Sequence, residues 1–185
     1  MNSGFTNFHF RGAVFLWASL FSWVGGGSLH AAASTPIDIE IVFLSQKVDL
    51  PPALSNIDTV PDNAGLMGAR IAIGDNNTTG RFLKHKYTLV EKTISPDENV
   101  EQAFTRLTSD GGTLFVLDLP ASSLDIVRKH AKAGQILLFN ARASDDRFRS
   151  KNCHAHLLHS IPSPAMRTDA LAQYLLTKRW KEWLL

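Results

Sequence analysis

The densest group of metal-ligating side chains lies in one short segment, which carries Cys153, His154, His156 and His159. Thiolate and imidazole are the usual ligands of zinc and copper in proteins. Structural zinc sites, however, usually combine ligand pairs from two separate segments, and this sequence has no second cluster. Two interpretations therefore stay open. One is an exported metal-binding module, and the other is a loop that enters a strand, with histidines that cap it or face solvent.

Two further segments carry side chains that can do chemistry. Residues 145–149 read DDRFR, which can supply an acid/base pair with an arginine clamp or form a helical turn with an aspartate as N-cap. Residues 121–123 read ASS and open a predicted helix directly after a strand. Backbone N–H groups and hydroxyls at such a helix start can take an anion or a carboxylate, or they can simply cap the helix.

Catalytic motifs are absent from the sequence. It contains no G-x-S-x-G, H-E-x-x-H, C-x-x-C or Walker segment, and no Ser/His/Asp set is defined by spacing. We therefore expect a protein without catalytic residues. A hydrolase is the enzymatic alternative, and it would need a nucleophile with a base within hydrogen-bond reach.

The elements that would position these residues alternate between strands and helices. Apolar, β-branched segments predict strands over 37–44, 87–94, 113–119 and 135–139, with a short fifth strand at 157–161. Helical spacing predicts helices over 64–75, 100–107, 120–134 and 163–183. We expect the first helix to carry Leu66, Ile71 and Ile73 on one apolar face. The NNTTG segment, 76–80, is expected to end that helix, with Gly80 as a left-handed cap.

This alternation predicts the fold class α/β, with a doubly wound parallel sheet and helices on both faces. Ligands of such sheets bind outside the carboxyl ends of the strands. The loops that matter for function are therefore 45–63, 119–123 and 140–156.

The amino terminus has the pattern of a secretory signal. Arg11 precedes the apolar run 13–24, which is followed by three glycines and by the small residues of 31–33. The apolar run is shorter than the ~20 residues that span a bilayer, so we expect a cleaved signal peptide over 1–33 rather than a retained membrane anchor.

Charge and cysteine content exclude several classes of protein. The chain has 185 residues, with 19 Lys and Arg against 17 Asp and Glu, so its charge favours neither nucleic acid nor an anionic membrane. The one cysteine cannot form a disulfide framework within the chain. The length suits one core of ordinary domain size.

Several motifs together resemble a known family. The segments IDIEIVFLSQ and GLMGARIAIGDNNTTGRFLKHKYTLVEKTI, in that order, resemble the amino-terminal half of the periplasmic solute-binding proteins of branched-chain amino-acid type ABC importers. More narrowly, DNNTTGRF, LDLPA, FNARASDDRFR and LLHSIPSPAM resemble the branch associated with PQQ-dependent alcohol oxidation.

This resemblance implies a hinged, two-lobe type I periplasmic binding fold. Such a protein captures a small molecule in the periplasm and delivers it to the permease and ATPase subunits at the inner membrane, without a cofactor or a metal. Residues 34–160 would form the amino-terminal lobe. Residues 161–185 would form the hinge crossing and the first helix of a truncated second lobe.

The resemblance also implies a ligand site. The family uses a serine after its third strand, and a small residue and a threonine after its fourth. The matching positions are Ala121-Ser122 and Ala143-Ser144. Pro120, Asp145-Asp146 and Arg142 depart from the family pattern, and we include Arg142 among the expected ligand-binding residues.

The last helix would pack on strands of the second lobe in that family. We therefore expect its apolar face, at Ala170, Leu171, Tyr174 and Leu175, to be exposed in this chain and to promote self-association. A site with one wall is also expected to bind solutes weakly or not at all.

The first prediction concerns export. Because the apolar run 13–24 is followed by small residues at 31 and 33, the signal should be cleaved so that Ser34 becomes the mature amino terminus. Intact mass measurement of the exported protein checks this. A membrane-bound form that keeps Met1 would contradict it.

Overall fold

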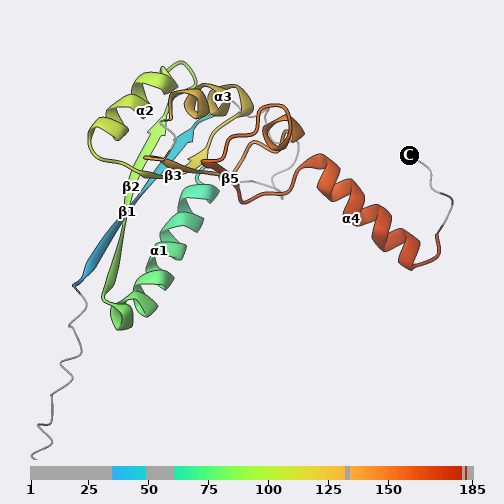
Figure 1. Cartoon of the computed structure of the whole chain (residues 1–185), viewed down its shortest axis with the longest axis horizontal. Coiled ribbons are helices and arrows are strands. Elements are labelled where there is room, and N and C mark those ends of the chain that lie inside the picture. Colours follow the sequence, from blue (N-terminus) through green and yellow to red (C-terminus); the bar gives the residue numbers. More distant parts are fainter. Residues whose placement is uncertain (1–34, 49–60, 132–133, 181, 183–185) are drawn as a thin grey trace, which may run out of the picture. The chain divides into compact units, whose positions relative to one another are not determined.

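A computed structural model describes residues 35–48, 61–131, 134–180 and 182, all of which belong to the unit Ser34–Leu185. The expected signal peptide lies outside these described residues. The elements in chain order are β1 (Ile37–Gln46), α1 (Ala64–Leu83), β2 (His85–Ile94), α2 (Val100–Ser109), β3 (Leu114–Asp118), α3 (Ala121–His130), β4 (Leu137–Asn140), the 3₁₀ turn η1 (Asp146–Arg149), β5 (Leu157–His159) and α4 (Pro164–Thr177) (Figure 1).

The strands form one five-stranded parallel sheet in the order β2-β1-β3-β4-β5, which confirms the predicted fold class. The chain moves outward from β1 to β2 and then passes back over β1 to β3. Right-handed crossovers in these opposite directions place α1 on one face of the sheet and α2 and α3 on the other, as Figure 1 shows. The carboxyl ends of all five strands therefore share one edge.

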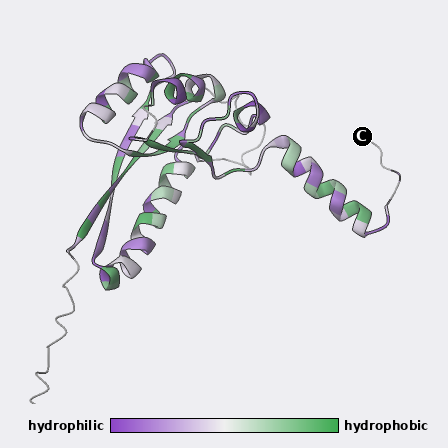
Figure 2. Cartoon of the chain, viewed as in Figure 1, coloured by the Kyte–Doolittle hydropathy of each residue, from purple (hydrophilic) through white to green (hydrophobic). Residues whose placement is uncertain are grey.

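The hydrophobic core lies between the sheet and the pair α2 and α3. Val42, Leu44 and Phe115 of the sheet belong to one buried cluster with Phe104 of α2. The rings of Phe104 and Phe115 lie 4.9 Å apart between centroids. Burial of each large side chain of this kind stabilises the fold by about 1.5–3 kcal/mol. Figure 2 shows the apolar residues gathered along the strands.

The opposite face of the sheet is covered less completely. Phe43 is buried on this face, where Gly65 of α1 lies close to its ring. Farther along the sheet, Val116 and Phe139 are only half-buried, and Leu158 is 45% exposed. An apolar surface over β3, β4 and β5 is therefore partly open to solvent.

Helix α4 has no buried residue. Leu171 and Tyr174 are exposed, which agrees with the expected exposure of the apolar face of this helix. The self-association expected from that exposure stays a prediction. Among the residues that the structure describes, no helix is both long and apolar enough to cross a membrane.

The expected end of the first helix was wrong. Helix α1 continues through the NNTTG segment to Leu83, and Lys84 provides the left-handed cap with φ of 56°. Asn77 accepts a hydrogen bond from the Tyr87 N–H and donates one to the Tyr87 carbonyl, each at 2.8 Å. Gly80 is buried inside the helix. A side chain does not fit at this position, because a Cβ there would lie 2.6 Å from the carbonyl oxygen of His85. The segment therefore attaches α1 to β2 and does not form a turn.

The covered stripe of α1 follows from this contact. Ile71, expected on the apolar face, is 66% exposed. The residues that do face the sheet recur every three or four positions and include Leu66, Ala69, Ile73, Asn77 and Gly80. Helices α3 and α4 also end earlier than expected, at His130 and Thr177, because Ala131 is extended and Arg179 has a positive φ.

Two glycines of α1 give a matched test of this packing. Gly80→Ala should lower the free energy of unfolding by about 1–3 kcal/mol, because the added methyl group overlaps the backbone of β2. Gly74→Ala should raise it by about 0.5–1 kcal/mol, because Gly74 has open space around it and alanine favours the helix. Urea denaturation measures both. Stabilisation by both substitutions would contradict the close approach at Gly80.

Candidate functional site

Arg142 occupies the centre of the carboxyl edge of the sheet. Its Nη1 donates to the carbonyl oxygen of Gln46, at 2.9 Å, and to that of Asp118, at 3.4 Å. These carbonyls end β1 and β3, the neighbouring strands between which the chain reverses its direction of travel across the sheet. Ligands of doubly wound sheets bind at this switch point. The structure therefore places a one-third-exposed guanidinium where the fold offers a ligand site.

Asp118 adds a negative charge at the same place. Its Oδ1 lies 3.6 Å from Nη1 of Arg142. Its Oδ2 lies against the first turn of α1, where a Cβ on Gly65 would come within 2.8 Å of it. A carboxylate at a helix amino terminus is stabilised by the helix dipole. The switch point thus presents one charge of each sign.

Asn140 holds the turn that carries Arg142. This asparagine is fully buried at the end of β4. Its Oδ1 accepts hydrogen bonds from the backbone N–H groups of Arg142 and Ala143, at 3.2 and 2.9 Å. Its Nδ2 donates to the Ala143 carbonyl and to Nδ1 of His159. Ala143 is buried with both backbone groups bonded to Asn140, whereas Ser144 is half-buried.

The other predicted site residues, Ala121 and Ser122, begin α3; Ala121 is half-buried and Ser122 is exposed. The N-cap is Pro120, without a side-chain capping bond, so the serines do not cap this helix. Ser123 donates to Oε1 of Gln46, and Nε2 of Gln46 donates to the Pro96 carbonyl at 3.1 Å. The side chain of Gln46 therefore connects the start of α3 to the switch point. The backbone carbonyl of Gln46 bonds to Arg142.

The DDRFR segment forms the helical turn η1, as one of the two interpretations had it. Phe148 is fully buried, and the guanidinium carbon of Arg147 lies 4.7 Å from the centre of its ring. Asp145 pairs with Arg147 at 3.4 Å and makes no capping bond. Arg149 reaches inward and donates to the Ile161 carbonyl. The segment therefore has a packing role beside the carboxyl edge of the sheet.

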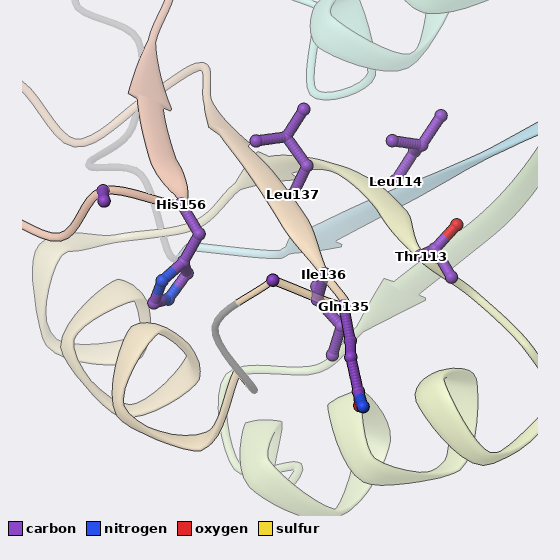
Figure 3. A pocket seen from close by; sticks show the side chains of 8 residues that line it. Thr113, Leu114, Gln135, Ile136, Leu137 and His156 are labelled. Atoms are coloured by element: carbon purple, nitrogen blue, oxygen red, sulfur yellow. The ribbon is translucent and has the colours of Figure 1, made fainter.

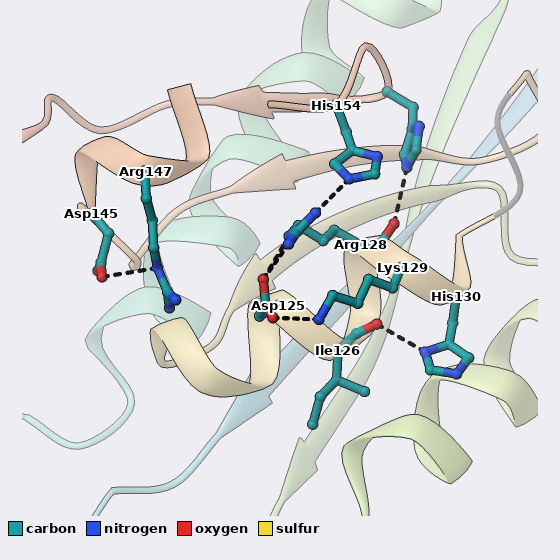
Figure 4. A network of polar contacts seen from close by, with 9 residues as sticks. Asp125, Ile126, Arg128, Lys129, His130, Asp145, Arg147 and His154 are labelled. Carbon is teal, nitrogen blue, oxygen red and sulfur yellow. Dashed lines mark hydrogen bonds and ion pairs between the residues drawn. The ribbon is translucent and has the colours of Figure 1, made fainter. Parts of the chain in front are cut away.

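The cysteine and histidines do not come together around one point. His154 accepts a hydrogen bond from the buried Arg128 of α3, whose guanidinium also binds Asp125 (Figure 4). His156 contacts the Arg128 carbonyl, whereas His159 binds Asn140. Cys153 is exposed. Within the described part of the chain, no group of three or more potential ligands is placed to hold a metal. The three histidines form hydrogen bonds within the fold, which favours the loop interpretation.

The enzymatic alternative gains no support from the described residues. The hydroxyl groups of Ser45 and Thr93 bond to each other, and Ser123 bonds to an amide oxygen. No serine, threonine or cysteine side chain in the described ranges bonds to a histidine or a carboxylate.

A recess lies at the opposite, amino edge of the sheet. It has a volume of about 550 Å³ and is lined by residues that precede or begin β3, β4 and β5, including Leu114, Ile136, Leu137 and His156 (Figure 3). Its wide, mostly apolar surface lacks convergent charged groups. The carboxyl edge, by contrast, brings together the charged and polar side chains of Arg142, Asp118 and Asn140.

Sequence reasoning missed Gln46, Asp118 and Asn140, and it considered His159 only as a metal ligand and not as a partner of Asn140. Each is the last residue of its strand, and a polar residue that ends an apolar strand is a signal that could have found them.

Comparison with known proteins supports the fold. The sequence matches no family model and no curated protein. Among solved structures, it is similar to the closed form of the leucine-, isoleucine-, valine-, threonine- and alanine-binding protein from Brucella ovis, with a TM-score of 0.55 and 19% sequence identity. The match covers 77% of this chain and 37% of that protein. The chain thus has an α/β fold that resembles one lobe of a periplasmic binding protein.

The bond between His154 and Arg128 predicts a dependence of stability on pH. Burial, followed by the charges of Arg128 and His156, lowers the pKa of His154, so the folded state favours neutral imidazole. The contribution of neutral His154 to the stability of the fold is complete above its unfolded-state pKa of ~6.5. This contribution is lost as pH falls toward the lower pKa of the folded state. Urea unfolding should therefore show lower stability at about pH 5 than at about pH 7.5.

His154→Gln provides the control, because its amide oxygen can accept from Arg128 without titrating. The variant should depend less on pH across this interval, which lies above the range where Asp125 titrates. An unchanged pH dependence would show that His154 does not carry the effect.

Proposed function

We propose that this chain is a solute-binding component of an ABC importer, which captures a small molecule in the periplasm and delivers it to the permease and ATPase subunits. The observation that carries the proposal is the placement of Arg142 and Asp118 at the switch point of a sheet that resembles a binding-protein lobe. The structurally similar Brucella protein is named for binding five amino acids. The export signal read from the sequence supports a periplasmic location.

Binding would occur by closure of two lobes on the solute. Residues 34–160 would supply the first lobe, and 161–185 would supply the crossing and the first helix of the second lobe. Only a solute that binds the closed state more tightly can drive such closure. A single lobe leaves much of a small solute in water, so this chain should bind its solute weakly.

The solute would contact the carboxyl edge. Ser122 and Ser144 can donate and accept hydrogen bonds, Arg142 can hold an anionic group, and the backbones of Ala121 and Ala143 complete the wall. The narrower relation to the branch associated with PQQ-dependent alcohol oxidation rests on the sequence motifs. It makes short alcohols and their acids reasonable probes beside the amino acids.

Nuclear magnetic resonance can detect weak binding and locate it. The ¹⁵N-labelled chain is titrated with leucine, isoleucine, valine, threonine and alanine, and then with short alcohols and their acids. We expect at least one probe to shift the amide resonances of 119–123 and 141–144, because these segments form the wall. Shifts confined to the amino edge, or none with any probe, would contradict the proposal.

Two arginines provide matched variants. Arg142→Gln should abolish the shifts caused by a carboxylate-bearing probe, because it removes the charge at the switch point. Arg81→Gln removes the same charge from the exposed surface of α1 and should leave them unchanged. Equal responses of the two variants would indicate a general effect of charge.

A further inference from the structure

His159 ends β5 and lies beside the residue that shapes the candidate site. Nδ1 of His159 is 2.9 Å from Nδ2 of Asn140. The orientation of the Asn140 amide is set by the backbone, since Oδ1 accepts from the N–H groups of Arg142 and Ala143. The Nδ2 group must therefore face His159 as a donor. It follows that Nδ1 accepts this bond and carries no proton.

The surroundings of His159 also favour the neutral ring. Asn140 faces it from β4, the backbone of Phe148 bonds it from η1, and Arg149 of η1 is the charged group acting on it. Burial, followed by the positive charge of Arg149, lowers the pKa of His159, whereas the bond to Phe148 acts in the opposite direction. In the described residues around it, no carboxylate is placed to stabilise an imidazolium.

We propose that His159 is a positioning residue for the candidate site, and that its protonation loosens the Arg142–Ala143 turn through Asn140. The site is then formed at neutral pH and weakened in acid. The coupling itself is a property of this chain, and its meaning as regulation of binding depends on the proposed function.

The physical step is the addition of one proton from solvent to Nδ1. This places an N–H donor opposite the donor group of Asn140, so the hydrogen bond between them is lost. If the Asn140 amide rotates to offer its oxygen to the ring, its NH₂ group then faces the N–H groups of Arg142 and Ala143. Without rotation, Asn140 loses the acceptor that β5 provided. With rotation, the N–H groups of the turn lose the acceptor that Asn140 provided. Arg142, which spans the ends of β1 and β3, depends on that turn for its position.

Amide resonances test the coupling without a solute. In a pH titration of the full ¹⁵N-labelled chain, the resonances of Arg142 and Ala143 should shift with the same midpoint as the His159 ring, below the ordinary histidine value of ~6.5. His159→Asn places an amide oxygen near the position of Nδ1, where it accepts the same bond but cannot titrate. In this variant both resonances should stay at their neutral-pH positions.

Two further variants complete the test. His154→Gln removes the other histidine whose pKa is lowered, and it should leave the Ala143 shift unchanged. Asn140→Asp offers a carboxylate to the ring and should move the His159 midpoint above that of the wild type. If His159→Asn does not fold, this variant still tests whether His159 and residue 140 are coupled. A His159 ring that titrates without any shift of Ala143, or an Ala143 shift that persists in His159→Asn, would overturn the proposal.

The consequence for binding is measured separately. The probe that shifts 141–144 at neutral pH should lose affinity at about pH 5 in the wild type and keep it in His159→Asn. If no probe binds at any pH, the proposed function fails while the amide titration still decides the coupling. If a probe binds equally at both pH values, the coupling does not regulate the site.

Discussion

The parallel pairing of β1 with β3, while β2 pairs on the other side of β1, is the constraint on which the rest of the structure depends. Right-handed crossovers then require α1 to cover one face of the sheet and α2 and α3 the other. In doubly wound sheets, ligands bind where these two directions of travel diverge, beyond the carboxyl ends of the strands concerned. In this chain those strands are β1 and β3, and Arg142 bonds to the residues that end them.

The polar groups at this edge form one connected set. The carbonyls of Gln46 and Asp118 hold the guanidinium of Arg142, and Asn140 holds the backbone that carries it. His159 then ties Asn140 to β5. Because Asn140 is buried, an unsatisfied group there would cost about 1–3 kcal/mol, so the set is expected to keep one arrangement. Such order is what a binding surface needs to recognise a small polar molecule.

The cysteine and histidine segment shows how composition can mislead about chemistry. Cys153, His154, His156 and His159 are close in sequence, yet their surroundings differ. The guanidinium of Arg128 bonds to Nε2 of His154, so this nitrogen is not available to a metal. His159 has turned toward β4, where it meets an amide. Ligands that are adjacent in sequence form a metal site only if the fold directs their lone pairs to one point.

The sequence by itself determined the α/β class, the strand positions and the parallel sheet, because apolar β-branched runs and helical spacing are local properties. The roles of the last residues of the strands and of the NNTTG segment could not be determined in this way. Local signals did not place Asn77 and Gly80 inside a helix, because both residues are there for their contacts with the backbone of β2. Likewise, Arg142 bonds to Gln46 across 96 positions of the chain. Only the tertiary structure decided these contacts, because the partner of a polar group depends on which distant segments the fold brings beside it.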